Sequence, residues 1–151
     1  MAISANWYGN ALTGQYSATA ARRVDWVGGT IKVALCTVAY VPNQDTDVFF
    51  AAVTNELPTA GGYTAGGLAL AGKSVSYDAA SNDTRLIAAA SVWAAATFTA
   101  RIAVVYDATT GVAATEPLLG FVNFGADETV AAGTFTITWD ATNGVLKVTP
   151  A

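Results

Sequence analysis

Three pairs of acidic residues could in principle supply the two carboxyl groups that acid–base chemistry uses, although the sequence alone does not give the distance between them. They are Asp45 with Asp47, Asp78 with Asp83, and Asp127 with Glu128. Two carboxyl groups that face each other across a cleft can hydrolyse a glycosidic bond. Each of these pairs, however, falls in a predicted turn or loop, where Asp commonly accepts hydrogen bonds from backbone N–H groups. We therefore interpret all three pairs as structural.

The Asp45–Asp47 pair also forms an Asp-x-Asp fragment, which could offer oxygen ligands to a calcium ion. A calcium-binding loop needs a glycine and a terminal glutamate at fixed positions after such a fragment. Neither residue follows here. The sequence therefore predicts no metal site.

The other residue types that enzymes use are scarce. The chain has no His and one Cys, Cys36, which lies in an apolar run and is expected to be buried. Catalysis by Ser-His-Asp or Cys-His groups and metal sites rich in His or Cys are therefore excluded. The glycine-rich stretch 59–67 lacks the Gly-Lys-Ser/Thr of a phosphate loop. We expect no enzymatic activity, no catalytic residue and no cofactor.

Composition points to a single folded domain. The chain has 151 residues, of which 53% are hydrophobic and 12% charged, so it is too apolar to be disordered and too short for two good cores. Its net charge of −4 opposes binding to nucleic acid. No apolar stretch is long enough to span a membrane and no signal sequence is recognisable, so we expect synthesis in a cytoplasm and no membrane partner.

The N-terminal residues 1–28 combine aromatic residues with small polar ones. The aromatic residues are Trp7, Tyr8, Tyr16 and Trp26, and two adjacent arginines, Arg22 and Arg23, lie between them. Isolated aromatic residues commonly fill pockets on a neighbouring chain. We interpret 1–28 as a docking arm whose six named residues bind a partner, and we expect a folded domain to remain when residues 1–23 are deleted. The alternative is that the arm folds back onto its own domain.

Alternation of apolar and polar residues predicts strands in the remaining chain. The expected strands are 31–37, 73–78, 84–88, 92–106, 118–124, 134–140 and 145–149, with one short helix capped at Asp45 or Thr46 and running to Asn55. Turn residues separate the strands at intervals typical of antiparallel folds. We predict an all-β fold, an antiparallel β-sandwich or barrel-like domain over 29–151 with an extended N-terminal arm.

Turn chemistry also predicts how these strands are connected. Residues 79–83 should join a hairpin, 125–133 should be a polar connection, and Asn143-Gly144 should turn strand 134–140 back onto 145–149. Outward threonines at 97, 99, 134, 136 and 138 would give an uncharged sheet face that suits assembly with other chains. Trp139 falls on the inward face, so only Trp7 and Trp26 remain for an alternative function, carbohydrate or receptor binding.

Several segments resemble a family of small virion structural proteins of tailed bacteriophages. They are residues 2–23, 31–47 (IKVALCTVAYVPNQDTD), 99–107 (TARIAVVYD), 117–125 (PLLGFVNFG), 133–140 (GTFTITWD) and 144–148. The resemblance covers most of the chain and implies a part of a phage particle assembled in the host cytoplasm. Small acidic β-domains with an N-terminal arm resemble capsid decoration (cement) proteins, which implies the major capsid protein or another virion protein as partner and a homo-oligomer, with a trimer favoured. A tail tube, ring or fibre-adaptor subunit is the alternative within the virion.

Overall fold

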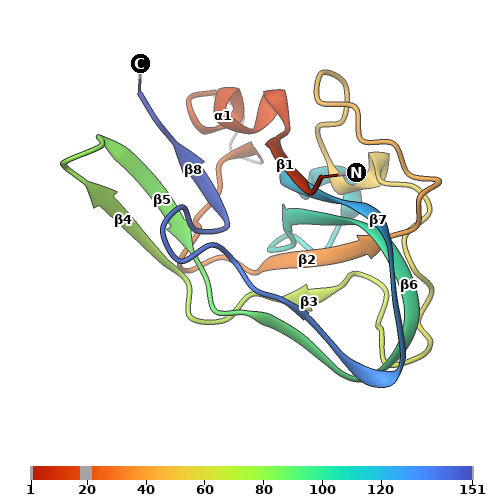
Figure 1. The fold of residues 1–151 in the computed structure, drawn as a ribbon. Coiled ribbons are helices and arrows are strands. Elements are labelled where there is room, and N and C mark those ends of the chain that lie inside the picture. Colours follow the sequence, from red (N-terminus) through yellow and green to blue (C-terminus); the bar gives the residue numbers. More distant parts are fainter. Residues whose placement is uncertain (1, 18–21, 151) are drawn as a thin grey trace.

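Two antiparallel β-sheets form the body of the protein in the computed structural model, which describes residues 2–17 and 22–150 (Figure 1). The larger sheet has the order β1 (Ser4–Trp7), β7 (Leu118–Ile137), β6 (Ser91–Asp107), β2 (Ile31–Cys36) and β3 (Leu68–Ala69). The smaller sheet has the order β4 (Ser74–Asp78), β5 (Asp83–Ile87) and β8 (Leu146–Val148). The prediction of an all-β, sandwich-like fold is confirmed, and the sheets do not close into a barrel.

The centre of the larger sheet is the main hydrophobic core. β2 and β6 pair from Ile31↔Asp107 to Cys36↔Ile102, and nearly every side chain in this paired region is buried. A strand that is covered on both faces needs apolar residues at consecutive positions, as 102–106 provides. Cys36 is buried as expected, and burial raises the pKa of its thiol to about 12.

The longest strand, β7, shows an error in the predicted connections. Residues 125–133 continue the strand, because β6 pairs with β7 from Tyr106↔Leu118 to Ser91↔Ile137. Gly125 and Ala132 take positive φ angles, and irregularities interrupt the register, so the ribbon bends without ending. In Figure 1 β6 and β7 curve together down the right side of the molecule, and we call this pair of strands the β6–β7 ribbon.

Aromatic side chains fill the inner face of that ribbon. Trp93 pairs across the strands with Phe135, with ring centroids 5.8 Å apart, and Phe98 lies 5.3 Å from Phe135. Tyr63, in the glycine-rich loop, packs on Trp93 at 6.5 Å. The threonines of the opposite face are exposed, as predicted, at positions 97, 99, 134, 136 and 138.

The single predicted helix is misplaced. Between Asp45 and Asn55 only one 3₁₀ turn forms, at Phe50–Ala52, because Phe49 forms a β-bridge with Pro117 and the Phe50 ring stacks on Tyr106 with centroids 3.9 Å apart. A second 3₁₀ turn spans Ala113–Thr115. The α-helix α1 lies instead at Gly9–Gln15, inside the predicted arm, and buries the small residues Ala11 and Gly14. No helix in the described ranges 2–17 and 22–150 is long and apolar enough to cross a membrane.

The hairpin of β4 and β5 forms as predicted, but the last strand has a different partner. β8 pairs with β5, from Thr84↔Val148 to Leu86↔Leu146, and not with residues 134–140. Leu146 packs closely against β7 at Gly120, where a Cβ atom would lie 2.6 Å from the leucine. A glycine at this position therefore allows the small sheet to pack against the larger one.

Candidate functional site: an aromatic cavity

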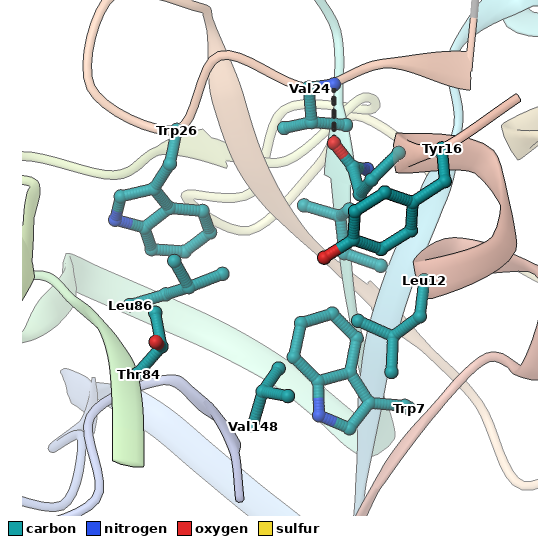
Figure 2. A pocket seen from close by; sticks show the side chains of 10 residues that line it. Trp7, Leu12, Tyr16, Val24, Trp26, Thr84, Leu86 and Val148 are labelled. Atoms are coloured by element: carbon teal, nitrogen blue, oxygen red, sulfur yellow. Dashed lines mark hydrogen bonds between the residues drawn. The ribbon is translucent and has the colours of Figure 1, made fainter. Parts of the chain in front are cut away.

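The most site-like feature is a cavity between the N-terminal segment and the small sheet (Figure 2). It has a volume of about 220 Å³, and we call it the aromatic cavity. Its lining residues are Trp7, Leu12, Gln15, Tyr16, Val24, Trp26, Thr84, Leu86, Leu119 and Val148. None of these side chains is charged, and three carry aromatic rings, so the cavity is suited to an apolar or aromatic group.

Strand alternation explains which side chains of the small sheet reach the cavity. Directly paired residues of neighbouring strands point to the same face. Thr84 pairs with Tyr77 on one side and Val148 on the other, and Leu86 pairs with Val75. This face of the sheet is therefore apolar and points toward the N-terminal segment.

The opposite face of the small sheet holds its ionised side chains. Arg85 binds Asp78 at 2.7 Å and lies 3.6 Å from Asp83, and Lys147 lies 3.4 Å from Asp83. Hydrogen bonds, led by one that Thr149 donates at 2.6 Å, lower the pKa of Asp83 to about 2. The Asp78–Asp83 pair is thus occupied in holding three strands together.

The two indole rings in the cavity wall have their polar edges already satisfied. Trp7 donates its Nε1–H to the carbonyl of Lys147 at 2.9 Å, and Trp26 donates to the carbonyl of Ile87 at 3.0 Å. Gln15 accepts a hydrogen bond from the Val24 amide at 3.0 Å, drawn in Figure 2. The cavity walls therefore consist mainly of carbon atoms. The polar side-chain atoms of the lining that have not been accounted for by these hydrogen bonds are the hydroxyl groups of Thr84 and Tyr16.

The structure brings three of the six predicted partner-binding residues to this cavity: Trp7, Tyr16 and Trp26. Trp26 is 4% exposed, whereas Tyr16 is 91% exposed and stands at the rim. Trp26 is therefore a wall of the cavity, and Tyr16 is the aromatic ring of the set that a partner can reach.

Tyr8 was predicted to bind a partner, and the structure corrects this prediction. Its side chain is fully buried, with its ring 5.2 Å from that of Phe121 and its hydroxyl 2.7 Å from that of Tyr40. β1 also pairs with β7 from Ser4↔Asn123 to Trp7↔Gly120. Within the described residues of 1–28, the chain thus folds back onto its own domain, which is the alternative left open by the sequence. Residues 1 and 18–21 lie outside the described residues.

Arg22 and Arg23, which were predicted to bind a partner, both donate hydrogen bonds to backbone carbonyls of the N-terminal segment. Arg22 is half-buried and donates to the carbonyl of Asn10 at 2.8 Å. Arg23 is exposed and donates to the carbonyl of Ser17 at 3.0 Å. Both guanidinium groups therefore hold the backbone of the N-terminal segment, and neither lines the aromatic cavity.

In each of the two remaining acidic pairs, one carboxylate has a structural role. Asp47 accepts hydrogen bonds from Tyr40 Oη and the Asn43 amide, both at 3.0 Å, while Asp45 is exposed. Asp127 forms an ion pair with Arg101 at 3.3 Å. Within 2–17 and 22–150, no three side chains of His, Cys, Asp or Glu come together in a way that could hold a metal ion.

Sequence reasoning missed the other walls of the cavity. Leu12 comes from α1, which was expected to be an extended arm, and Leu119 comes from β7. Thr84 and Leu86 lie on a correctly predicted strand, and their spacing by two indicates a shared face. No local signal, however, places that face opposite two tryptophans.

Two exposed apolar side chains line the cavity, and two more lie on the same face of the small sheet, on the neighbouring strand β4. Leu12 (37% exposed) and Tyr16 lie on the N-terminal side of the cavity, and Val75 (50%) and Tyr77 (64%) extend its sheet side. We call these four residues the apolar rim.

Comparisons with protein-family models, curated proteins and solved structures find no match to this chain.

Proposed function

We propose that this protein is a structural subunit of a tailed-bacteriophage virion, and in particular a capsid decoration protein that bridges and stabilises neighbouring capsid subunits. The sequence resemblance supports the first part. The observation that carries the proposal is the aromatic cavity together with the exposed apolar rim, because exposed apolar surface beside a cavity commonly marks a protein-binding site. The protein would act by binding other chains and not by catalysis.

The contact would differ from the one that the sequence suggested. In place of a loose arm, the partner would meet a preformed surface built by the N-terminal segment and the small sheet. A preformed surface avoids the entropy cost of ordering a flexible segment on binding. Many copies on one particle would then multiply a modest contact into a stable shell.

The threonine face of the β6–β7 ribbon supports a second contact. Its threonines at 97, 99, 134, 136 and 138 are exposed, and Thr99 shares a hydrogen bond of 2.8 Å with Thr129 across the strands. Away from the Arg101–Asp127 ion pair next to Thr99, these positions carry no charge and can be covered by a neighbour at a low desolvation cost. The decoration role accordingly includes a homo-oligomer, as the resemblance implies.

Mass spectrometry of purified particles, with heads separated from tails, tests this proposal. We expect the chain in the head fraction at high copy number. Purified protein should also rebind to heads stripped of it, and Tyr77→Ser should weaken rebinding more than Val41→Ser, which alters a 79% exposed residue outside the apolar rim. Absence of the chain from both fractions would refute a virion role.

A tail ring or tube subunit is the second candidate, because of the outer edge of β7. Among the described residues, β1 pairs with β7 only at 120–123, and no other strand pairs with that edge from 124 to 137. An unpaired strand edge can bind a strand of a neighbouring copy and so close a ring. Recovery of the chain in the tail fraction alone would favour this role.

Carbohydrate binding has less physical support. A sugar site needs several free hydrogen-bonding groups, but the indole N–H groups of Trp7 and Trp26 donate to backbone carbonyls. Trp139 donates its indole N–H to Ser91 at 3.3 Å. A glycan array tests this alternative directly, and binding lost on changing Tyr16 would support it.

A further inference from the structure

The Tyr16 side chain is directed into the aromatic cavity without packing inside it. Figure 2 shows its hydroxyl group pointing toward the space between Trp7 and Trp26. Tyr16 is nevertheless 91% exposed, and the volume of about 220 Å³ is measured with Tyr16 in this position. Tyr16 is therefore a wall of the cavity and not its occupant.

The size of the cavity fits a small aromatic molecule. An apolar cavity of about 150 Å³ in another protein binds benzene. The aromatic cavity, at about 220 Å³, has room for that ring and a polar substituent. The aromatic side chains of its wall can contact such a ring edge-to-face or in an offset stack.

The chemistry of the lining selects an uncharged ligand with a hydrogen-bonding group. No lining side chain is charged, so an ionised ligand would lose its hydration without gaining a partner. The Nε1–H groups of Trp7 and Trp26 already donate to backbone carbonyls. The side-chain hydroxyl groups of Thr84 and Tyr16 make no hydrogen bond within the described residues, so they can bind the hydroxyl or N–H group of a ligand.

The place of Tyr16 favours a small molecule over a side chain of a protein partner. Its ring stands in the approach to the cavity, as Figure 2 shows. A partner's side chain would have to bring its own backbone past this ring, whereas a free molecule needs only the space of the cavity. Val75 and Tyr77 lie on β4 outside the lining, and they stay available to the protein partner of the proposed function.

We propose that the aromatic cavity binds a small, uncharged aromatic molecule of the phenol or indole class. The ligand ring lies between Trp7 and Trp26, and its polar group bonds to the hydroxyl of Thr84 or Tyr16. The Tyr16 ring covers the ligand and gains by losing exposed apolar area. The inference goes beyond the proposed function and does not depend on it.

Phenol is the probe, and the indole N–H signals of the four tryptophans in a ¹H–¹⁵N correlation spectrum report where it binds. We expect the signals of Trp7 and Trp26 to shift and to saturate with a dissociation constant of about 0.1–1 mM, which suits a ligand of this size. Trp93 and Trp139 lie outside the lining and should not shift. Benzoate, an aromatic ring that is ionised at neutral pH, should bind at least about tenfold more weakly.

Two variants test the cavity itself. Thr84→Phe fills the cavity and should raise the dissociation constant for phenol at least about tenfold. Tyr16→Ser removes the covering ring and should raise it about two- to tenfold, and this result stands even if Thr84→Phe fails to fold, because Tyr16 is exposed. Val41→Ser, which alters an exposed residue outside the lining, is the matched control and should leave the constant unchanged.

Four results would overturn the proposal. They are no saturable shift at Trp7 and Trp26 up to about 10 mM phenol, equal shifts at all four tryptophans, benzoate binding as tight as that of phenol, and a dissociation constant that both variants leave unchanged. Particle binding is measured separately from phenol binding. A chain that binds phenol but is absent from particles would remove the virion role and keep the site, and a particle protein that does not bind phenol would do the reverse.

Discussion

Replacing Tyr8 tests whether the N-terminal segment is part of the folded body. The Tyr8 ring is fully buried and packs 5.2 Å from Phe121. Tyr40 donates its hydroxyl proton to Asp47 at 3.0 Å, so Tyr8 donates to Tyr40 across 2.7 Å. The ring and the hydroxyl group of Tyr8 can therefore be removed separately.

The two parts of the side chain differ in their expected contribution. Tyr8→Ala removes a large buried ring and should lower the free energy of unfolding by about 3–5 kcal/mol. Tyr8→Phe removes one hydrogen bond and should cost about 1 kcal/mol, since Tyr40 keeps Asp47 as its acceptor. Tyr16→Ala should stay within about 0.5 kcal/mol of wild type, because the side chain is 91% exposed.

Urea unfolding followed by tryptophan fluorescence measures these differences. For a domain of this size, 1 kcal/mol corresponds to about 2–4 °C in melting temperature, so thermal melts give an independent measure. If Tyr8→Ala fails to fold, a comparison of Tyr8→Phe with Tyr16→Ala still tests whether the change at Tyr8 lowers the free energy of unfolding more than the change at Tyr16. If Tyr8→Ala unfolds at the same urea concentration as Tyr16→Ala, the packing of residues 2–17 onto the sheet is refuted.

Three further predictions concern substitutions and reactivity at single sites. Gly67→Ala should lower the free energy of unfolding by at least about 2 kcal/mol, because Gly67 has a positive φ and an added Cβ atom would clash with the Val33 carbonyl oxygen. Gly111→Ala is the control: Gly111 also has a positive φ but open space around it, so urea titration should show a loss of about 1 kcal/mol. Burial raises the pKa of Glu116 in the folded chain above its value in the unfolded chain. The folded chain therefore binds the carboxyl proton more tightly, and its stability falls as the pH rises from the unfolded pKa through the folded pKa. Glu116→Gln should therefore be more stable than wild type at about pH 7 and lose this advantage below about pH 4, as thermal melts across pH can show. The Cys36 thiol, with its pKa raised to about 12, should react with a disulfide reagent at about pH 8 only after unfolding, and rapid labelling of the native protein would contradict its burial.

Local pattern predicts most strands because the sheet geometry repeats every two residues. The alternation in 73–78 and 84–88 predicts the β4–β5 hairpin, and the run 92–106 predicts β6. These strands pair with neighbours that are close in sequence or have strong apolar periodicity. Such features can be read from a short window.

The errors arise where partners distant in sequence decide the conformation. Residues 125–133 are polar enough to resemble a loop, but pairing with β6 keeps them extended. Residues 46–55 have the spacing of a helix, but Phe49 and Phe50 contact Pro117 and Tyr106. Tertiary contacts outweigh helix propensity, which amounts to less than about 1 kcal/mol per residue.

The candidate site was half predicted for the same reason. Trp7, Tyr16 and Trp26 stand out from composition alone, since such rings are rarely left without a contact. Their common cavity depends on β8 pairing with β5 and on α1 folding against the sheet. Both events join residues far apart in the sequence, so no local pattern in 1–28 shows that the rings form walls around a shared space.

This packing changes how attachment to a partner has to be tested. Deletion of residues 1–23 was expected to leave a folded domain, but it would remove β1, its pairing with β7, and the buried Tyr8 ring. The loss of that ring alone is a large fraction of the roughly 5–15 kcal/mol that stabilises a typical domain. Loss of binding by a truncated chain would therefore not separate a lost surface from a lost fold. Substitutions at Tyr16 and Tyr77 alter the surface and leave the core in place, so they separate binding from folding.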